Sequence, residues 1–139
     1  MNVHVDWQNG MSFQGVSPTG FTVPLGTDAA FGGNNDGFKP MELMLISLAG
    51  CTGMDVISIL MKKKQVVKMF RVNIEAQRGD EHPKVFKSIV IEYVFGGENL
   101  DAPAIERAVQ LSEEKYCPAQ AMLRHAVSIS HKITIIDQT

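Results

Sequence analysis

The spacing of apolar residues predicts β-structure in the first quarter of the chain. Apolar and polar positions alternate over residues 3–7, as in a strand with one apolar face. Asn9-Gly10 follows, a dipeptide typical of tight β-hairpin turns, and two more short strands complete a meander over residues 1–25. Three strands are barely stable alone, so we expect this sheet to pack against another part of the fold.

A long central helix is predicted over residues 40–64, where apolar side chains lie on nearly every side. Pro40 suits the first helical turn, and three lysines at 62–64 complement the negative end of the helix dipole. A helix that is apolar all round is expected to be buried. Its charge-free part, residues 43–54, is too short for a membrane span, which needs about 20 apolar residues. We therefore expect no membrane association.

The size of this helix also bears on the oligomeric state. One chain of 139 residues can hardly surround a helix of about six or seven turns. A second copy would cover the remaining apolar face, so the pattern predicts a homodimer.

The rest of the chain, residues 66–139, predicts a C-terminal α/β lobe. Its expected elements are two strands, two helices and a last strand, at residues 70–77, 85–95, 101–116, 118–124 and 127–136. The glycine-rich segment 26–38 shows neither the alternation of a strand nor the periodicity of a helix, which predicts a loop. The order β-β-β-α-β-β-α-α-β, with local hairpins, favours a single α+β domain with antiparallel sheets.

Composition narrows the class of protein. The formal net charge of -2 argues against a general nucleic-acid binder, which needs a basic excess. Two cysteines exclude a disulfide-dense secreted scaffold, and the four histidines show no metal-ligand spacing. No targeting segment is visible at the start of the sequence, so we expect a protein of the reducing cytoplasm without a bound metal or cofactor.

Cys51 is the first candidate for chemistry. At helical spacing it shares one side with Ser47, Asp55 and Ser58, a polar stripe on an apolar helix. The stripe fits a reactive thiol, but it equally fits a small apolar cysteine with hydroxyls bonded back to the helix carbonyls. The residues alone leave both interpretations open.

Cys117 is the second candidate, because it directly precedes Pro118 and so occupies a helix N-cap position. Free N–H groups and positive potential at a helix N-terminus favour a thiolate, although such a residue also commonly marks nothing more than a helix start. Glu113 and Glu114 would oppose a thiolate if they faced it. Helix position alone makes Cys117 the easier thiolate, since the middle of a helix offers Cys51 no free N–H groups and Asp55 lies one turn away.

Three segments together resemble the OsmC/Ohr family: PMELML at 40–45, LAGCTGMDV at 48–56 and SEEKYCP at 112–118. Within that family the chain is most similar to a less characterised branch with a GCTGMDV helix. The resemblance implies a two-lobed α+β fold, an intertwined homodimer with two equivalent interface sites, and thiol-based reduction of organic hydroperoxides in oxidative stress defence.

The resemblance also assigns roles to the two cysteines. Cys51 is the peroxide-attacking residue and becomes a sulfenic acid, and Cys117 is the resolving residue that condenses with it to a disulfide. An external dithiol reductant then reopens the disulfide. The expected partners are thus a second copy of the chain, a small organic hydroperoxide and a thiol reductant, with no nucleic acid.

Two departures from the peroxidases of the family affect the supporting residues. Those enzymes have a glutamate directly after the helix-starting proline, whereas here Met41 intervenes and Glu42 comes one residue later. They also use an arginine from the N-terminal half, whereas the first arginine here is Arg71. Glu42 and Asp55 are the possible supporting residues. The alternative function is a non-catalytic redox sensor or small-ligand-binding protein on the same fold.

Overall fold

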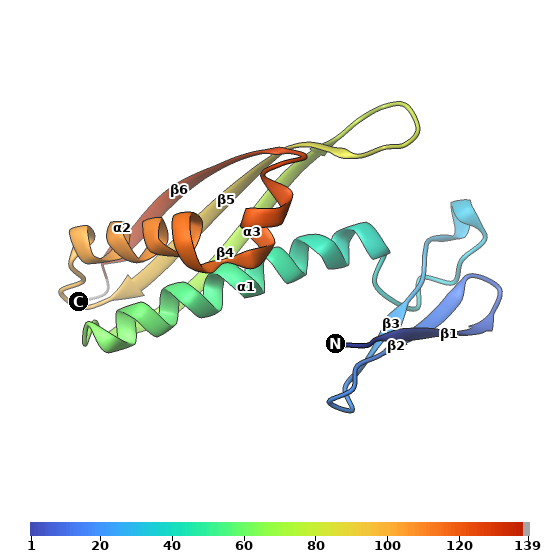
Figure 1. Ribbon diagram of the computed structural model, residues 1–139, viewed down its shortest axis with the longest axis horizontal. Helices are drawn as coiled ribbons and strands as arrows, with labels where there is room; N and C mark the ends of the chain where they lie inside the picture. Colours follow the sequence, from blue (N-terminus) through green and yellow to red (C-terminus); the bar gives the residue numbers. More distant parts are fainter. Residues whose placement is uncertain (138–139) are drawn as a thin grey trace. The chain divides into compact units, whose positions relative to one another are not determined.

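A computed structural model describes residues 1–137 and shows an α+β fold with two three-stranded sheets (Figure 1). The chain forms two compact units, Met1–Leu45 and Ile46–Thr139. The boundary between these N-terminal and C-terminal units falls inside the long helix α1, Pro40–Lys62, rather than in a loop. The helix ends at Lys62, two residues earlier than we predicted. Lys64 follows in the left-handed conformation, and its N–H bonds back to the carbonyl of Met61.

The N-terminal unit contains the predicted meander. Strands β1 (His4–Asn9), β2 (Ser12–Val16) and β3 (Thr22–Leu25) pair antiparallel in chain order. The predicted turn after β1 contains Gly10 at a φ of 51°, which glycine adopts without strain. The loop that follows contains one short 3₁₀ turn, η1 (Ala29–Phe31).

The sheet of the C-terminal unit corrects one expectation. Strands β4 (Val67–Arg78) and β5 (Phe86–Gly97) pair antiparallel, but β6 (Ser128–Asp137) runs parallel to β5. We expected antiparallel sheets throughout. The helical segments between β5 and β6 carry the chain back to the end of the sheet where β5 begins, which is the connection that a parallel pair requires.

These helical segments lie over one face of the sheet together with α1 (Figure 1). They are α2 (Ala102–Leu111), a π-helical turn η2 (Ser112–Tyr116) and α3 (Pro118–Leu123). We predicted a single helix up to residue 116. Instead, the backbone widens at Ser112, whose carbonyl accepts the N–H of Cys117 at 2.8 Å, five residues on. The wider turn ends where Pro118 begins α3.

Within the single chain only one stripe of α1 is buried, which agrees with the expectation that one chain can hardly surround this helix. Its buried residues recur every four positions and face the core formed by β5 and α2: Leu48, Thr52, Val56 and Leu60. Met54 and Met61 are 74% and 68% exposed. By length and composition α1 would suffice to cross a bilayer, but the buried stripe makes it a packing element of the C-terminal unit.

Candidate functional site

The two cysteines meet in the C-terminal unit. Cys51 lies midway along α1 and is half-buried, whereas Cys117 is the N-cap of α3 and only 2% exposed. Both are free thiols, and the side chain of Cys51 lies within hydrogen-bonding reach of Cys117. The structure thus brings together the two thiols that the sequence singled out.

The environment of Cys117 corrects the expectation that it is the easier thiolate. Its sulfur accepts the backbone N–H of Gln120 at 3.4 Å, as an N-cap should. Burial nevertheless raises the pKa of Cys117 to about 11, and the neighbouring Cys51 thiol adds to the increase. The loss of water around the sulfur outweighs the N–H groups of α3, so Cys117 is a neutral thiol near pH 7.

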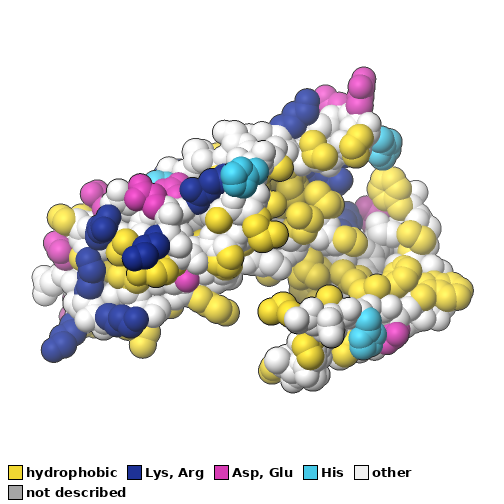
Figure 2. All heavy atoms as spheres, viewed as in Figure 1, with side chains coloured by type: hydrophobic (Ala, Val, Ile, Leu, Met, Phe, Trp, Pro, Cys, Tyr) yellow, Lys and Arg dark blue, Asp and Glu magenta, His cyan; other side chains and the backbone are white. Residues whose placement is uncertain are grey.

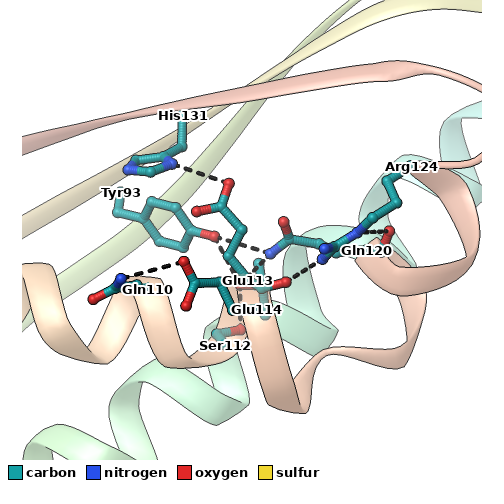
Figure 3. A network of polar contacts seen from close by, with 9 residues as sticks. Tyr93, Gln110, Ser112, Glu113, Glu114, Gln120, Arg124 and His131 are labelled. Atoms are coloured by element: carbon teal, nitrogen blue, oxygen red, sulfur yellow. Dashed lines mark hydrogen bonds and ion pairs between the residues drawn. The ribbon is translucent and has the colours of Figure 1, made fainter.

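A buried polar network adjoins the two cysteines and connects four elements (Figure 3). The Thr52 hydroxyl of α1 lies 2.7 Å from the Tyr93 hydroxyl of β5 and 2.8 Å from the Ser112 hydroxyl of η2. The side-chain amide of Gln120, in α3, donates to Thr52 at 3.0 Å and to Tyr93 at 3.3 Å. All four side chains are at most 2% exposed, so their hydrogen bonds are expensive to lose.

The carboxylate of Asp55 determines the direction of these hydrogen bonds. Ser112 donates its one hydrogen to Asp55 Oδ2 at 3.0 Å, so it accepts from Thr52. Thr52 has then used its hydrogen and accepts from both Tyr93 and Gln120. Each hydroxyl in the network therefore donates to one defined partner, which leaves these side chains little freedom to rotate.

The two possible supporting residues have defined partners. Asp55 forms the end of the buried network through its bond to Ser112. Glu42 belongs to the N-terminal unit, where its carboxylate accepts the backbone N–H of Lys39 at 2.9 Å and caps the start of α1. Support of the thiol chemistry by Glu42 or Asp55 stays a prediction.

Arg124 is the arginine that the structure places beside a cysteine. It lines a cavity of about 190 Å³ together with Cys117. Its guanidinium donates to the carbonyl oxygens of Gln120 and Glu113 (Figure 3). The other three arginines lie elsewhere: Arg71 is exposed on β4, Arg78 bonds the carbonyl of Lys84, and Arg107 bonds Gln110.

The two glutamates before Cys117 line the same cavity but are engaged with other groups. The Glu113 carboxylate lies 3.2 Å from His131 Nδ1, and the Glu114 carboxylate accepts from Gln110 at 3.2 Å (Figure 3). Each of these carboxylates, whose opposition to a thiolate at Cys117 we raised from the sequence, thus has a hydrogen-bonding partner of its own.

Sequence reasoning missed Thr52, Tyr93 and Gln120 as parts of the site. Thr52 lies in one of the motif segments but carries no signal beyond a hydroxyl inside an apolar helix, and Tyr93 reads as one aromatic of a buried strand. Ser112 begins another of the motif segments and is fully buried. Among the described residues, no group of three or more metal-ligating side chains is clustered.

Comparison with known protein families identifies the class of protein to which this fold and this pair of thiols belong. The OsmC-like protein family matches residues 33–132, and the chain belongs to this family. Protein YhfA of Escherichia coli strain K12 is 35% identical to the chain, with 98% of each covered.

Solved structures agree with this assignment. A hypothetical protein from Aquifex aeolicus is 32% identical with a TM-score of 0.80, covering 97% of this chain and 96% of that one. The organic hydroperoxide resistance protein OhrB of Bacillus subtilis shares the fold at 20% identity with a TM-score of 0.62, covering 96% of this chain and 98% of that one.

Proposed function

We propose that the protein is a thiol peroxidase that reduces small organic hydroperoxides through Cys51 and Cys117. The observation that carries the proposal is the contact between these two free thiols, one half-buried and one buried. Membership of the OsmC-like family supports it, because relatives with the same fold are named for organic hydroperoxide resistance.

In the first step the Cys51 thiolate attacks the O–O bond of the hydroperoxide. A sulfenic acid forms on Cys51, and the leaving alkoxide takes up a proton to become an alcohol. Cys51 suits this step better than Cys117, because it is half-buried whereas Cys117 is 2% exposed with its pKa raised to about 11. A buried neutral thiol is protected from direct attack on peroxide.

In the second step Cys117 condenses with the oxidised Cys51. A disulfide forms and water leaves, which prevents further oxidation of Cys51 to sulfinic acid. An external dithiol then reduces the disulfide by thiol–disulfide exchange and becomes a disulfide itself. This cycle requires no bound cofactor, and it fits the reducing cytoplasm, where such a reductant keeps thiols reduced.

The decisive experiment measures hydroperoxide consumption in the presence of dithiothreitol as the dithiol. We expect the wild-type protein to turn over cumene hydroperoxide many times, and Cys51→Ser to fall to the uncatalysed background, because the nucleophile is gone. Ser58→Ala, an exposed hydroxyl later on the same helix, serves as the control. Equal rates in the wild type and Cys51→Ser would remove the proposal.

One observation favours the alternative, a redox sensor. Among the described residues no arginine or lysine is bonded to Cys51, and the thiolates of thiol enzymes are commonly stabilised by a cation. A sensor would be oxidised by hydroperoxide once, to a disulfide that the dithiol does not reopen at a useful rate, so consumption would stop after one equivalent per chain. The consumption assay therefore separates the two functions.

We further propose that the protein is an obligate homodimer. The open face of α1 carries Met44, Ile46, Met54 and Met61, each at least 44% exposed. Figure 2 shows hydrophobic side chains gathered in patches rather than scattered singly. Apolar surface of this extent is typical of a subunit interface, and obligate interfaces commonly bury about 2,000 Å² or more.

Sedimentation equilibrium at micromolar concentration is expected to give the mass of two chains. Met54→Asp, which puts a charge on the open face of α1, should shift the equilibrium towards monomer or unfolded chain, because a charge is costly in an apolar interface. Lys87→Asp, an exposed position on β5, is the control. A well-folded wild-type monomer would contradict the proposal.

A further inference from the structure

Gln120 forms hydrogen bonds to Cys117 and to the residue next to Cys51. Its backbone N–H donates to the sulfur of Cys117, three residues earlier. Its side-chain amide donates to Thr52, the residue that follows Cys51 on α1. Through these two hydrogen bonds Gln120 connects the segment that carries Cys117 directly to the part of α1 that carries Cys51.

The segment around Cys117 needs such a connection. It consists of a five-residue π-helical turn and a six-residue α3. Helices this short have little stability of their own in water, so tertiary contacts must hold them in place. A disulfide in turn requires Cα atoms about 4.4–6.8 Å apart and a narrow range of torsion angles. Small movements of α3 would therefore remove Cys117 from reach of Cys51.

Thr52 is well suited to fix that position. It is fully buried and its hydroxyl has three partners, Tyr93, Ser112 and Gln120. Because the bond from Ser112 to Asp55 determines the direction of the others, Thr52 Oγ1 has both lone pairs occupied and its hydrogen donated. The hydroxyl therefore presents a fixed acceptor to Gln120, on a helix turn that also carries Cys51.

We propose that Thr52 and Gln120 are positioning residues that hold Cys117 against Cys51 for disulfide formation. The proposal deepens the proposed function by assigning its second step to a specific pair of side chains. In that step the Cys117 sulfur attacks the sulfenic sulfur of Cys51, the S–O bond breaks, and the hydroxyl leaves as water with the Cys117 proton. Neither Thr52 nor Gln120 exchanges atoms with the thiols.

The first test measures the disulfide equilibrium without any peroxide. In a glutathione buffer, the two protein thiols and one glutathione disulfide give the protein disulfide and two glutathione molecules, and intact mass spectrometry follows the ratio. Thr52→Val and Gln120→Leu should each lower the equilibrium constant about tenfold, because a buried hydrogen bond across the pair is lost and its partner is left unsatisfied. Thr52→Ser keeps the hydroxyl and should restore the wild-type value.

Matched controls make the same substitutions away from the cysteines. Thr134→Val removes a hydroxyl that donates to Glu92 at 2.9 Å, and Gln110→Leu removes an amide that bonds Arg107 and Glu114. Both controls should keep the wild-type equilibrium constant. Circular dichroism establishes that each variant is folded at the temperature of the measurement.

The second test separates the two chemical steps. After a pulse of cumene hydroperoxide, dimedone labelling measures sulfenic acid on Cys51 and mass spectrometry measures disulfide and sulfinic acid. In Thr52→Val and Gln120→Leu, the ratio of condensation rate to Cys51 oxidation rate should fall about tenfold, with more sulfinic acid at excess peroxide. A merely structural defect would instead slow both steps alike and lower the melting temperature without changing this ratio.

Each outcome is informative. Wild-type values for both Thr52→Val and Gln120→Leu in the glutathione test would overturn the positioning role, as would a tenfold loss that Thr52→Ser does not restore. If the wild type forms the disulfide with glutathione but not with hydroperoxide, the peroxidase proposal fails while the positioning role is still decided by the glutathione equilibria.

Discussion

In Cys117→Ser with dithiol present, hydroperoxide consumption should stop after at most two equivalents per chain instead of turning over, one for the sulfenic acid and a second where excess peroxide oxidises it further. Cys51 would still attack the O–O bond, but no neighbouring thiol would condense with the sulfenic acid. Excess peroxide should then convert Cys51 to sulfinic acid, which a dithiol does not reduce. Quantitative peroxide assay and peptide mass spectrometry of Cys51 measure both parts of this expectation.

Cys51→Ser provides the reciprocal measurement. Its remaining thiol is buried and neutral near pH 7, so the same peroxide pulse should leave Cys117 unmodified. Sustained turnover by Cys117→Ser would show that a dithiol can resolve Cys51 directly and that the second cysteine is dispensable. Oxidation of Cys117 in Cys51→Ser, with Cys51 inert in the other variant, would exchange the two roles.

The periodicity of the sequence predicted most of the elements, because most of them bury a regular face. The β-meander, the central helix and the strands over residues 70–77 and 85–95 all appear. The direction of β6 was missed, since alternation of apolar residues is the same in either orientation. The direction depends on the return path through α2 and α3, which only the packed structure determines.

The burial of α1 follows from the size of the chain. Apolar residues on every side of the helix indicated more apolar surface than one chain can cover, and the chain buries only the stripe through Leu48 and Leu60. The hydrophobic pattern reports what must be covered, not which molecule covers it. The exposed methionines of α1 are therefore the part of the pattern that a single chain does not explain.

The two cysteines of the candidate site stood out in the sequence, whereas the residues around them did not. Cys51 and Cys117 carry distinctive local contexts, one inside a helix and one before a proline. Thr52, Tyr93 and Gln120 lie on three elements far apart in the chain and become a network only when α1, β5 and α3 pack together. No local pattern marks such residues.

The acidity of Cys117 shows why local position is insufficient. An N-cap position predicts a stabilised thiolate, and the expected bond from Gln120 is present. Desolvation has the opposite effect and is larger here, because the sulfur is 2% exposed. Burial depends on the packing of several elements, so the sign of the pKa change could not be read from the position before Pro118.

The raised pKa of Cys117 predicts how the reactivity of this thiol changes with pH. In Cys51→Ser, Cys117 is the remaining thiol, and its alkylation by iodoacetamide proceeds through the thiolate. Burial, the largest cause, still raises the pKa of Cys117 in this variant, although the smaller contribution of Cys51 is gone. The rate should therefore rise about tenfold per pH unit from pH 7 to about pH 10, a change of about a thousandfold. The same thiol in denaturant should level off above about pH 9.

The free energy of unfolding should also depend on whether Cys117 carries its proton. Below about pH 8.5 both states hold the Cys117 proton, and above that value the unfolded chain loses it first. The free energy of unfolding should therefore decrease as pH rises towards the folded-state pKa of Cys117 of about 11. Urea unfolding of Cys51→Ser at pH 8 and pH 10 measures the decrease, and the same comparison in a variant that also carries Cys117→Ala should show a smaller one.

Alkylation that levels off near pH 9 in the folded protein, together with equal pH dependence of the two unfolding series, would contradict both expectations. Such a result would show that the helix N-terminus offsets burial and that Cys117 competes with Cys51 for peroxide.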